Sequence, residues 1–414
     1  MMQRYMVGVM GVCLCILFST QATANVPAWE NWQPVFEPQP YAQPQQPRQE
    51  FLPARQGSIP YQLQQAAYMP TPSTSQTVNC GLSETLNLPS LCLRRTHYTR
   101  EGLEILSDFL QQKSPWEQAA PLGNNVSNKA LMETTQVLLN WHNGRSNQSF
   151  NEQFDLIPIN SAKGTGKGNF TGYYTPTLQG SRVPTSRFRI PIYGKPKFTV
   201  NHLTNGDILN GALSGRGLEI AWVDDAFALS VAQVQGAAVI QFQDGRQSVL
   251  AYAGNNNHRF SAISQYLLAR GYMSGSLNNE RIAQWLRANP QKVREVLSSN
   301  ERYIFFKETK NPPATALGHS VIPGHTVAVD SRYIPHGAVL LAELPRVTVD
   351  GEPAGNEWRL LFAQDNGKAI QGNGRIDLYT GSGRIAEKAA YVISGARRTF
   401  MLVRKADNPW FAGL

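Results

Sequence analysis

Two carboxylates near the C-terminal end of the chain have a spacing that suits acid–base chemistry. An apolar run at 360–363 stops just before Asp365, and a second segment with alternating apolar residues carries Asp377. We interpret both segments as strands joined through a turn at 366–367. Burial at the end of a strand disfavours the charged carboxylate, and a second carboxylate nearby disfavours it further. The pattern therefore predicts a protonated Asp365 that acts as a general acid, with Asp377 close to it.

Structural roles are an equal alternative for these two carboxylates and for Asp330, because aspartates beside strands often cap turns or form salt bridges. Gly367 allows a substrate to approach the backbone closely. Lys368 would lower the proton affinity of Asp365 if it pointed inward. We expect Lys368 to face solvent.

Other catalytic patterns are missing from the sequence. The seven histidines form no H-E-x-x-H pair, and no G-x-S-x-G motif is present, which disfavours a zinc or serine hydrolase. The glycine-rich stretch at 164–168 is not followed by a helix pattern and is a poor phosphate loop. We expect neither a metal nor a cofactor.

Length and charge limit the class of protein. A chain of 414 residues has room for two or three domains. The net charge of +9 suits an anionic polymer or surface. No basic block is interleaved with aromatic residues, so we do not expect nucleic acid binding.

The N-terminal segment has the pattern of an export signal. Residues 1–24 contain a basic start, an apolar stretch at 7–18 and a small-residue cleavage pattern. The cysteines of the apolar stretch lie too deep in it for lipid attachment, so we expect no lipid anchor and a soluble exported protein. Residues 25–79 are rich in proline and glutamine, which predicts a disordered linker whose reach lets the folded part work away from an attachment point. Only Cys80 and Cys92 remain after the signal, and an isolated pair in an exported chain predicts a disulfide.

Hydrophobic periodicity gives the remaining organisation. Two amphipathic helices are expected near 100–111 and 129–142. Short strands follow from about 170 to 255, including one at 226–235, and suggest a barrel. Three helices then precede more strands, and one late helix lies near 385–392.

Several stretches together resemble the MltA family of lytic transglycosylases. Each stretch is weak alone, but their order is specific. They are 170–176 (FTGYYTP), 221–225 (AWVDD), 233–236 (QVQG), 252–255 (YAGN), 300–306 (NERYIFF), 328–337 (AVDSRYIPHG) and 364–372 (QDNGKAIQG).

The resemblance implies a fold and a domain division. The family has a double-psi β-barrel that carries a second, smaller β domain as an insertion. On this basis residues 80–178 and 304–414 form the large barrel, and residues 179–303 form the inserted domain. The last 90 residues or so resemble the three-aspartate barrel module of the family, with Asp330, Asp365 and Asp377.

The resemblance also implies a reaction. It places the single catalytic acid at Asp365, which cleaves the β-1,4 bond between N-acetylmuramic acid and N-acetylglucosamine of peptidoglycan and leaves a 1,6-anhydro product. The other residues expected to bind substrate or support the acid are Asp377, Asp330, Tyr174, Thr175, Gln235, Gly236, Gly367 and Ala369. Tyr174 could equally belong to the core, because side chains of a strand alternate between its faces.

This sequence differs from many relatives in two places. It lacks their lipid-attachment cysteine and carries the tail at 25–79 instead, through which cell-wall or division proteins could bind. Lys368 occupies the position where the relatives often have a second glycine. Two alternatives stay open: a peptidoglycan-binding protein without catalysis, and a glycoside hydrolase that uses two carboxylates.

Overall fold

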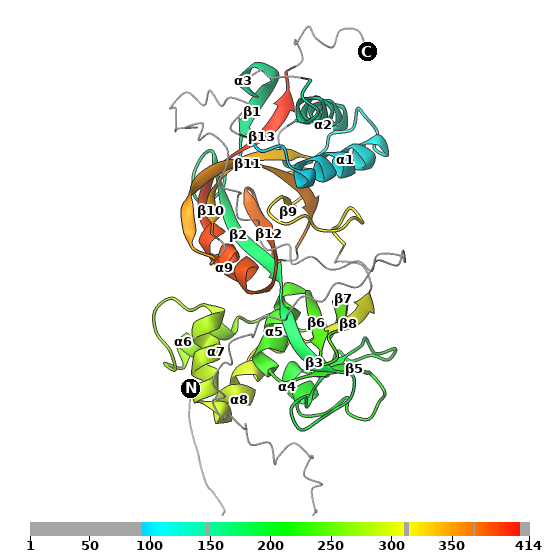
Figure 1. The fold of residues 1–414 in the computed structure, drawn as a ribbon, viewed down its shortest axis with the longest axis vertical. Coiled ribbons are helices and arrows are strands. Elements are labelled where there is room, and N and C mark those ends of the chain that lie inside the picture. Colours follow the sequence, from blue (N-terminus) through cyan, green and yellow to red (C-terminus); the bar gives the residue numbers. More distant parts are fainter. Residues whose placement is uncertain are drawn as a thin grey trace, which may run out of the picture. The chain divides into compact units, whose positions relative to one another are not determined.

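The computed structural model describes most of the chain beyond residue 92 (Figure 1). The predicted signal peptide, the proline- and glutamine-rich segment, the pair Cys80 and Cys92, and Lys368 all lie outside the described residues. Within the described part, no helix has the length and apolar character needed to cross a membrane. The described ranges are 93–123, 125–145, 150–309, 314–348, 350–367 and 369–405.

Seven strands form the first sheet, and six of them close into a barrel. The sheet order is β1-β13-β10-β11-β9-β12-β2, and an additional pairing between β13 and β2 closes the ring and leaves β1 outside it. The closed barrel and the second sheet described below confirm the predicted mainly β fold class. The strands are β1 (Phe154–Pro158), β2 (Lys167–Thr175), β9 (Thr326–Val329), β10 (Val339–Val347), β11 (Pro353–Asp365), β12 (Arg375–Ser382) and β13 (Gly395–Arg404).

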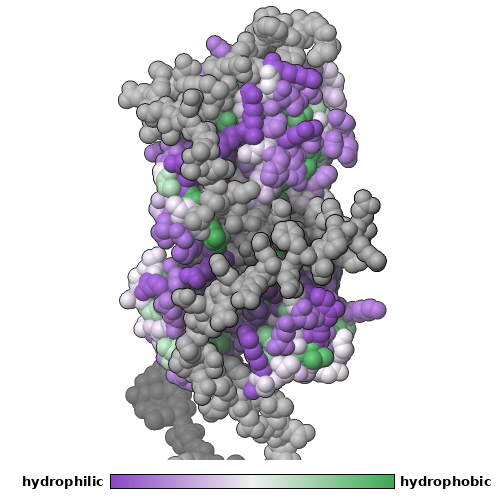
Figure 2. Space-filling model, in the orientation of Figure 1, coloured by the Kyte–Doolittle hydropathy of each residue, from purple (hydrophilic) through white to green (hydrophobic). Residues whose placement is uncertain are grey.

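Alternating side chains of the barrel strands divide between two cores. Val327, Leu361 and Ile376 share one buried cluster with Leu378. Leu360 and its neighbours on the opposite face of β11 form another cluster, together with residues of the two N-terminal helices. On the face shown in Figure 2, the coloured surface is mostly hydrophilic, as expected when the apolar side chains are buried in such cores.

The second sheet has six strands in the order β4-β5-β3-β6-β7-β8. A single bridge between Gly194, next to β4, and Phe306 of β8 brings the two edge strands together, so this sheet curls almost into a barrel. The strand at 304–309 pairs with β7, whereas the domain division implied by the MltA resemblance placed these residues in the large barrel. Cross-strand hydrogen bonds, which the sequence does not show, decide that assignment. The strands are β3 (Thr177–Ser181), β4 (Ile190–Tyr193), β5 (Glu219–Val223), β6 (Ala237–Phe242), β7 (Gln247–Asn255) and β8 (Ile304–Thr309).

The helices cover the sheets from outside. Helices α1 and α2 pack against β11 and β13, and α9 packs against β2 and β12 (Figure 1). Both predicted N-terminal helices, the three helices before β8 and the late helix are present. The helices are α1 (His97–Gln111), α2 (Asn128–His142), α3 (Phe150–Gln153), α4 (Asn205–Leu209), α5 (Ala226–Gln235), α6 (Ile263–Ala269), α7 (Asn279–Ala288), α8 (Val293–Ser298) and α9 (Gly383–Ile393).

The strand predicted at 226–235 is wrong, because this segment is helix α5. The Asp225 side chain caps the helix by accepting hydrogen bonds from the backbone N–H groups of Phe227 and Ala228. Gly236 ends the helix with a left-handed φ of 79°. The helix is apolar over much of its surface and lacks a clear one-sided pattern, so periodicity alone did not distinguish it from a buried strand.

Gly172 of β2 lets helix α9 approach the strand that will carry two residues of the site. A Cβ at Gly172 would lie 2.5 Å from the Cα of Ala390. We predict that Gly172→Ala lowers the free energy of unfolding by about 1–3 kcal/mol, since the clash is with backbone that cannot rotate away. Denaturant unfolding measures this. Gly194→Ala is the control because its new Cβ makes only ordinary contacts from 3.5 Å, and equal stability losses in both variants would contradict the close-packing argument.

Candidate active site

Strand register places the two predicted carboxylates on either side of one residue. Ala328 of β9 pairs with Asp365 of β11 in the parallel direction and with Asp377 of β12 in the antiparallel direction. Paired residues of neighbouring strands point to the same face of a sheet. Asp365 and Asp377 therefore share one face of the barrel wall, as their spacing in the sequence predicted.

An irregularity in the ladder sets the position of Asp365. The pairing of β11 with β9 shifts register between Ala363 and Asp365. The extra residue is Gln364, which is fully buried and accepts a hydrogen bond from the Thr326 hydroxyl at 2.6 Å. Bulges of this kind redirect side chains next to functional sites. Here the bulge brings Asp365, and not Gln364, into pairing with Ala328.

The Asp365 carboxyl is partly buried and held at both oxygens. Oδ2 accepts from the Tyr173 hydroxyl at 3.1 Å, and Oδ1 accepts from the backbone N–H groups of Asn366 at 2.9 Å and Ala316 at 3.1 Å. Burial raises the pKa of Asp365 above its usual value, while these three hydrogen bonds oppose the rise. Burial dominates, so the carboxyl keeps its proton to higher pH than an exposed aspartate.

Tyr173 stays a neutral donor to this acid. Burial raises the pKa of Tyr173 well above its usual value, and the charges of Asp365 and Asp377 raise it further. Its ring packs against that of Tyr379, with centroids 5.2 Å apart. The hydroxyl is therefore fixed in place and does not compete for the proton of Asp365.

His336 approaches Asp365 from the backbone side. Its Nε2 lies 3.2 Å from the carbonyl oxygen of Asp365, so this nitrogen carries the proton and donates it. Burial lowers the pKa of His336 and the charge of Lys113 lowers it further, while Asp365 opposes both effects. His336 is therefore neutral and holds the backbone of Asp365 through this hydrogen bond.

Asp377 is held by a short chain of polar groups. Its Oδ1 accepts from the Thr171 hydroxyl at 2.5 Å, and that hydroxyl accepts from Nη2 of Arg375 at 2.8 Å. Burial raises the pKa of Asp377; Thr171 and Arg375 lower it, and the charge of Asp365 raises it. The effect of the Asp365 charge on Asp377 agrees with the strand register, which pairs both residues with Ala328.

Asp330 has a different environment from the other two aspartates. It forms a two-point ion pair with Arg332, at 2.6 and 2.8 Å, and also accepts from the backbone N–H of Gly372 at 2.8 Å. Arg332 holds the pKa of Asp330 well below its usual value. The structural alternative fits Asp330 best, since its carboxylate ties the segment after Asp365 to the end of β9.

The predicted groove residues divide between buried supports and accessible positions. Tyr174 is only 6% exposed and packs with Ala386 and Ala390 of α9, so its ring belongs to the core. Thr175 is also buried, with its hydroxyl 2.9 Å from that of Tyr379. Gln235 accepts from the backbone N–H of Tyr174 at 3.1 Å.

The three small predicted residues lie nearer the surface. Gly236 is half-buried, and a Cβ there would meet no atom within 4 Å, so open space adjoins it. Beyond Asp365, Gly367 is half-buried and Ala369 is exposed. A Cβ at Gly367 would lie 2.8 Å from Cγ1 of Ile370, so a larger residue would disturb the turn after the acid.

The sequence-based reasoning missed Tyr173, Thr171, Arg375, Tyr379 and His336. Strand parity was the available signal for the first two, because residues 171 and 173 share a face and residue 174 lies on the other. The pairing of β2 with β12 sets Thr171 opposite Asp377 and Tyr173 opposite Tyr379. Which face of β2 meets the carboxylates depends on that non-local pairing. Within the described ranges no cluster of three metal-ligating side chains was found.

The chain matches two domain families. Residues 169–307 match the MltA specific insert domain, and residues 325–402 match the 3D domain. The first range contains nearly all of the second sheet together with β2, and the second contains β10, β11 and β12 with their aspartates. The resemblance to the MltA family that the motifs indicated is confirmed.

Curated relatives and solved structures agree with this match. The chain is 34% identical over 238 residues to membrane-bound lytic murein transglycosylase A of Vibrio cholerae, and 32% identical over 234 residues to that of Escherichia coli K12. These alignments cover 56% and 55% of this chain and 64% of each relative, slightly less than two thirds of their length.

Two solved structures extend the likeness over the described fold. A membrane-bound lytic murein transglycosylase from Agrobacterium tumefaciens superposes with a TM-score of 0.59 and 28% identity, covering 74% of this chain and 92% of that structure. E. coli MltA with bound chitohexaose gives a TM-score of 0.62 and 26% identity, covering 73% and 89%.

We predict that Tyr173→Phe raises the pKa of Asp365, because the variant removes a hydrogen bond that favours the charged form. A carboxyl-carbon NMR titration of the folded protein measures this shift. Tyr379→Phe is the matched control, since its hydroxyl bonds Thr175 and Ser382 and not the acid. A lowered pKa in Tyr173→Phe would show that the hydroxyl does not donate to Asp365.

Proposed function

We propose that this chain, which carries the MltA specific insert and 3D domains, is a lytic transglycosylase of peptidoglycan. It cleaves the β-1,4 bond between N-acetylmuramic acid and N-acetylglucosamine and leaves a 1,6-anhydro muramic end. The names of the relatives support the activity, and the chitohexaose bound to E. coli MltA supports a glycan ligand. The observation that carries the proposal is the partly buried Asp365 carboxyl, with its raised pKa and three fixed hydrogen bonds.

Asp365 first acts as the general acid. Among the described residues, its Oδ1 accepts two backbone hydrogen bonds and its Oδ2 accepts one, from Tyr173, so the proton resides on Oδ2. This proton moves to the glycosidic oxygen as the bond from that oxygen to C1 of the muramic residue breaks. The N-acetylglucosamine side leaves as an alcohol, and positive charge develops at C1.

The same carboxyl then acts as the base. The C6 hydroxyl oxygen of the muramic residue attacks C1, and its proton passes to the Asp365 carboxylate. Protonated Asp365 is regenerated and no water is consumed. While it is ionised, the carboxylate accepts from Tyr173, Asn366 and Ala316, which stabilise its charge between the two proton transfers.

The other two aspartates support this acid in different ways. The charge of Asp365 raises the pKa of Asp377. Because repulsion between like charges acts on both groups, ionised Asp377 in turn favours the protonated form of Asp365. Asp330 anchors the segment 366–372 through Gly372, and so fixes where Gly367 and Ala369 meet the glycan. Gln235, the last residue of α5, accepts from the backbone N–H of Tyr174 in β2, and Gly236 caps the same helix.

A two-carboxylate hydrolase is the second candidate, because Asp365 and Asp377 flank Ala328 on one face. It requires Asp377 to act on water or on the sugar, whereas Asp377 is already engaged by Thr171. The third candidate is a peptidoglycan-binding protein without catalysis. Binding alone does not require a carboxyl with a raised pKa such as Asp365. Product analysis separates all three.

We also propose that the protein acts outside the cytoplasm, in the periplasm or at the cell wall or outer membrane. Residues 1–24 are the proposed export signal and Cys80 with Cys92 the proposed disulfide, both of which lie outside the described residues. The curated relatives are named membrane-bound. Peptidoglycan strands are the proposed partner.

We predict that Asp365→Asn lowers the rate of cleavage of purified sacculi by about 10²–10⁴-fold, because an amide cannot donate or recover the proton. Muropeptide mass spectrometry measures the 1,6-anhydro products. Asp108→Asn, an exposed change on α1, is the control and retains activity.

Two results would contradict this assignment. Full activity in a folded Asp365→Asn protein would exclude Asp365 as the acid. Products of the parent protein that are heavier by one water, with reducing ends, would instead identify a hydrolase.

We predict that Asp377→Asn moves the alkaline limb of the pH–kcat/KM profile to lower pH. The variant removes the like charge that favours protonated Asp365, so Asp365 loses its proton at lower pH. The asparagine oxygen can still accept from Thr171, which preserves the local geometry. An alkaline limb that stays in place or moves to higher pH would remove Asp377 from this role, and Asp108→Asn again serves as the control.

A further inference from the structure

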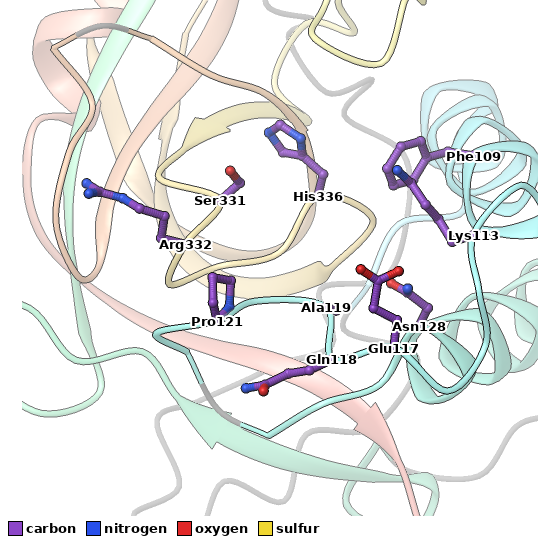
Figure 3. A pocket seen from close by; sticks show the side chains of 10 residues that line it. All are labelled: Phe109, Lys113, Glu117, Gln118, Ala119, Pro121, Asn128, Ser331, Arg332 and His336. Carbon is purple, nitrogen blue, oxygen red and sulfur yellow. The ribbon is translucent and has the colours of Figure 1, made fainter.

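A pocket lies next to the acid-bearing strand end, outside the site described above (Figure 3). It has a volume of about 300 Å³ and is lined by the end of α1, by residues of 113–121, by Asn128 and by the loop 331–336. The backbone N–H of Leu122 donates to the carbonyl of Arg332 at 2.8 Å, which joins the two loops. The walls are therefore held together by main chain and not only by side chains.

Two opposite charges face this pocket without pairing. In Figure 3 the Lys113 ammonium and the Glu117 carboxylate both point into the space, while Arg332 and Gln118 point away from it. Arg332 is already engaged by Asp330. Among the described residues, neither Lys113 nor Glu117 forms an ion pair. The Lys113 ammonium lies over the Phe109 ring, 4.8 Å from the ring centroid.

Uncharged polar groups complete the lining. Asn128 is only 7% exposed; its Nδ2 donates to the carbonyl of Ser114 at 3.0 Å, and Figure 3 places its amide beside Glu117. His336 lines the opposite wall and is the residue that donates to the Asp365 carbonyl. One side chain therefore separates the pocket from the backbone of the proposed acid.

An ammonium and a carboxylate that face one small space without pairing suit a ligand that carries both charges. A carboxylate on the ligand would pair with Lys113, and an ammonium would pair with Glu117 and the Asn128 amide. A neutral sugar would leave both protein charges without partners. The chemistry of the lining thus favours a short peptide with a free amine and a free carboxylate over a stretch of glycan.

We propose that this pocket binds the peptide stem of the muramic residue, with a stem carboxylate on Lys113 and the free amine of a diamino acid on Glu117. The inference rests on the proposed function, which brings the muramic sugar to Asp365. Each extended residue adds about 3.5 Å of reach, so a stem of a few residues spans the width of one side chain such as His336. The pocket then selects glycan strands that carry stems.

The first experiment measures binding without catalysis. Calorimetry follows a free tetrapeptide stem with its diamino acid amine intact, titrated into the full chain carrying Asp365→Asn. Adding Lys113→Gln should weaken binding about threefold to tenfold, as expected for a partly exposed charge pair. Acetylation of the stem amine should weaken binding to Asp365→Asn but not to the protein that also carries Glu117→Gln. Lys197→Gln, an exposed change in the second sheet region, is the control.

The second experiment uses the active protein. The parent should show a lower KM for strands with stems than for the same strands stripped by an amidase, and Lys113→Gln should bring the ratio of the two KM values towards one. Cleavage of both substrates with equal KM would overturn the pocket proposal and leave the proposed function intact. Cleavage of neither would overturn the proposed function, and absence of stem binding to Asp365→Asn would then overturn the pocket as well.

Discussion

The pairing of Ala328 with both carboxylate-bearing strands is the constraint on which the site depends. Because β9 lies between β11 and β12 in a closed barrel, the backbone positions of the two aspartates cannot separate without breaking ladder hydrogen bonds. Burial raises the pKa of both carboxyls, and the bulge at Gln364 places Asp365 opposite Ala328. The acid strength of the site is thus a property of strand register.

The three aspartates show how neighbours divide one residue type among different roles. Asp330 has a cation at 2.6 Å and remains charged, whereas Asp365 and Asp377 have hydroxyl and backbone donors and raised pKa values. Burial disfavours the ionised form of all three carboxyls. The three aspartates differ in their hydrogen-bond and ion-pair partners. With Arg332 as its partner, Asp330 stays ionised and holds the loop at Gly372, whereas Asp365 has no such cation among the described residues and can keep a proton.

Local patterns in the sequence were sufficient for most elements and for the catalytic candidate. Helical spacing identified α1, α2 and the late helix α9, and the apolar run before Asp365 identified the end of β11. Non-local pairing decided the remainder. Tyr174 was selected and Tyr173 missed, because only the register of β2 against β12 shows which face meets Asp377. Helix α5 was missed because its apolar residues do not show a helical period. The residues that indicate a helix are its end caps, Asp225 and Gly236.

The continuity of β2 and β3 has a consequence for building chimaeric proteins. Only Pro176 separates Thr175 of the barrel from Thr177 of the second sheet, and its carbonyl accepts from the N–H of Val239 at 2.8 Å. A domain exchanged at this junction must therefore keep 171–175 with the barrel and supply its own partner for residue 176. The match to the MltA specific insert domain begins at residue 169, inside β2, and so crosses this junction. The peptide around Pro176 therefore belongs to both sheets.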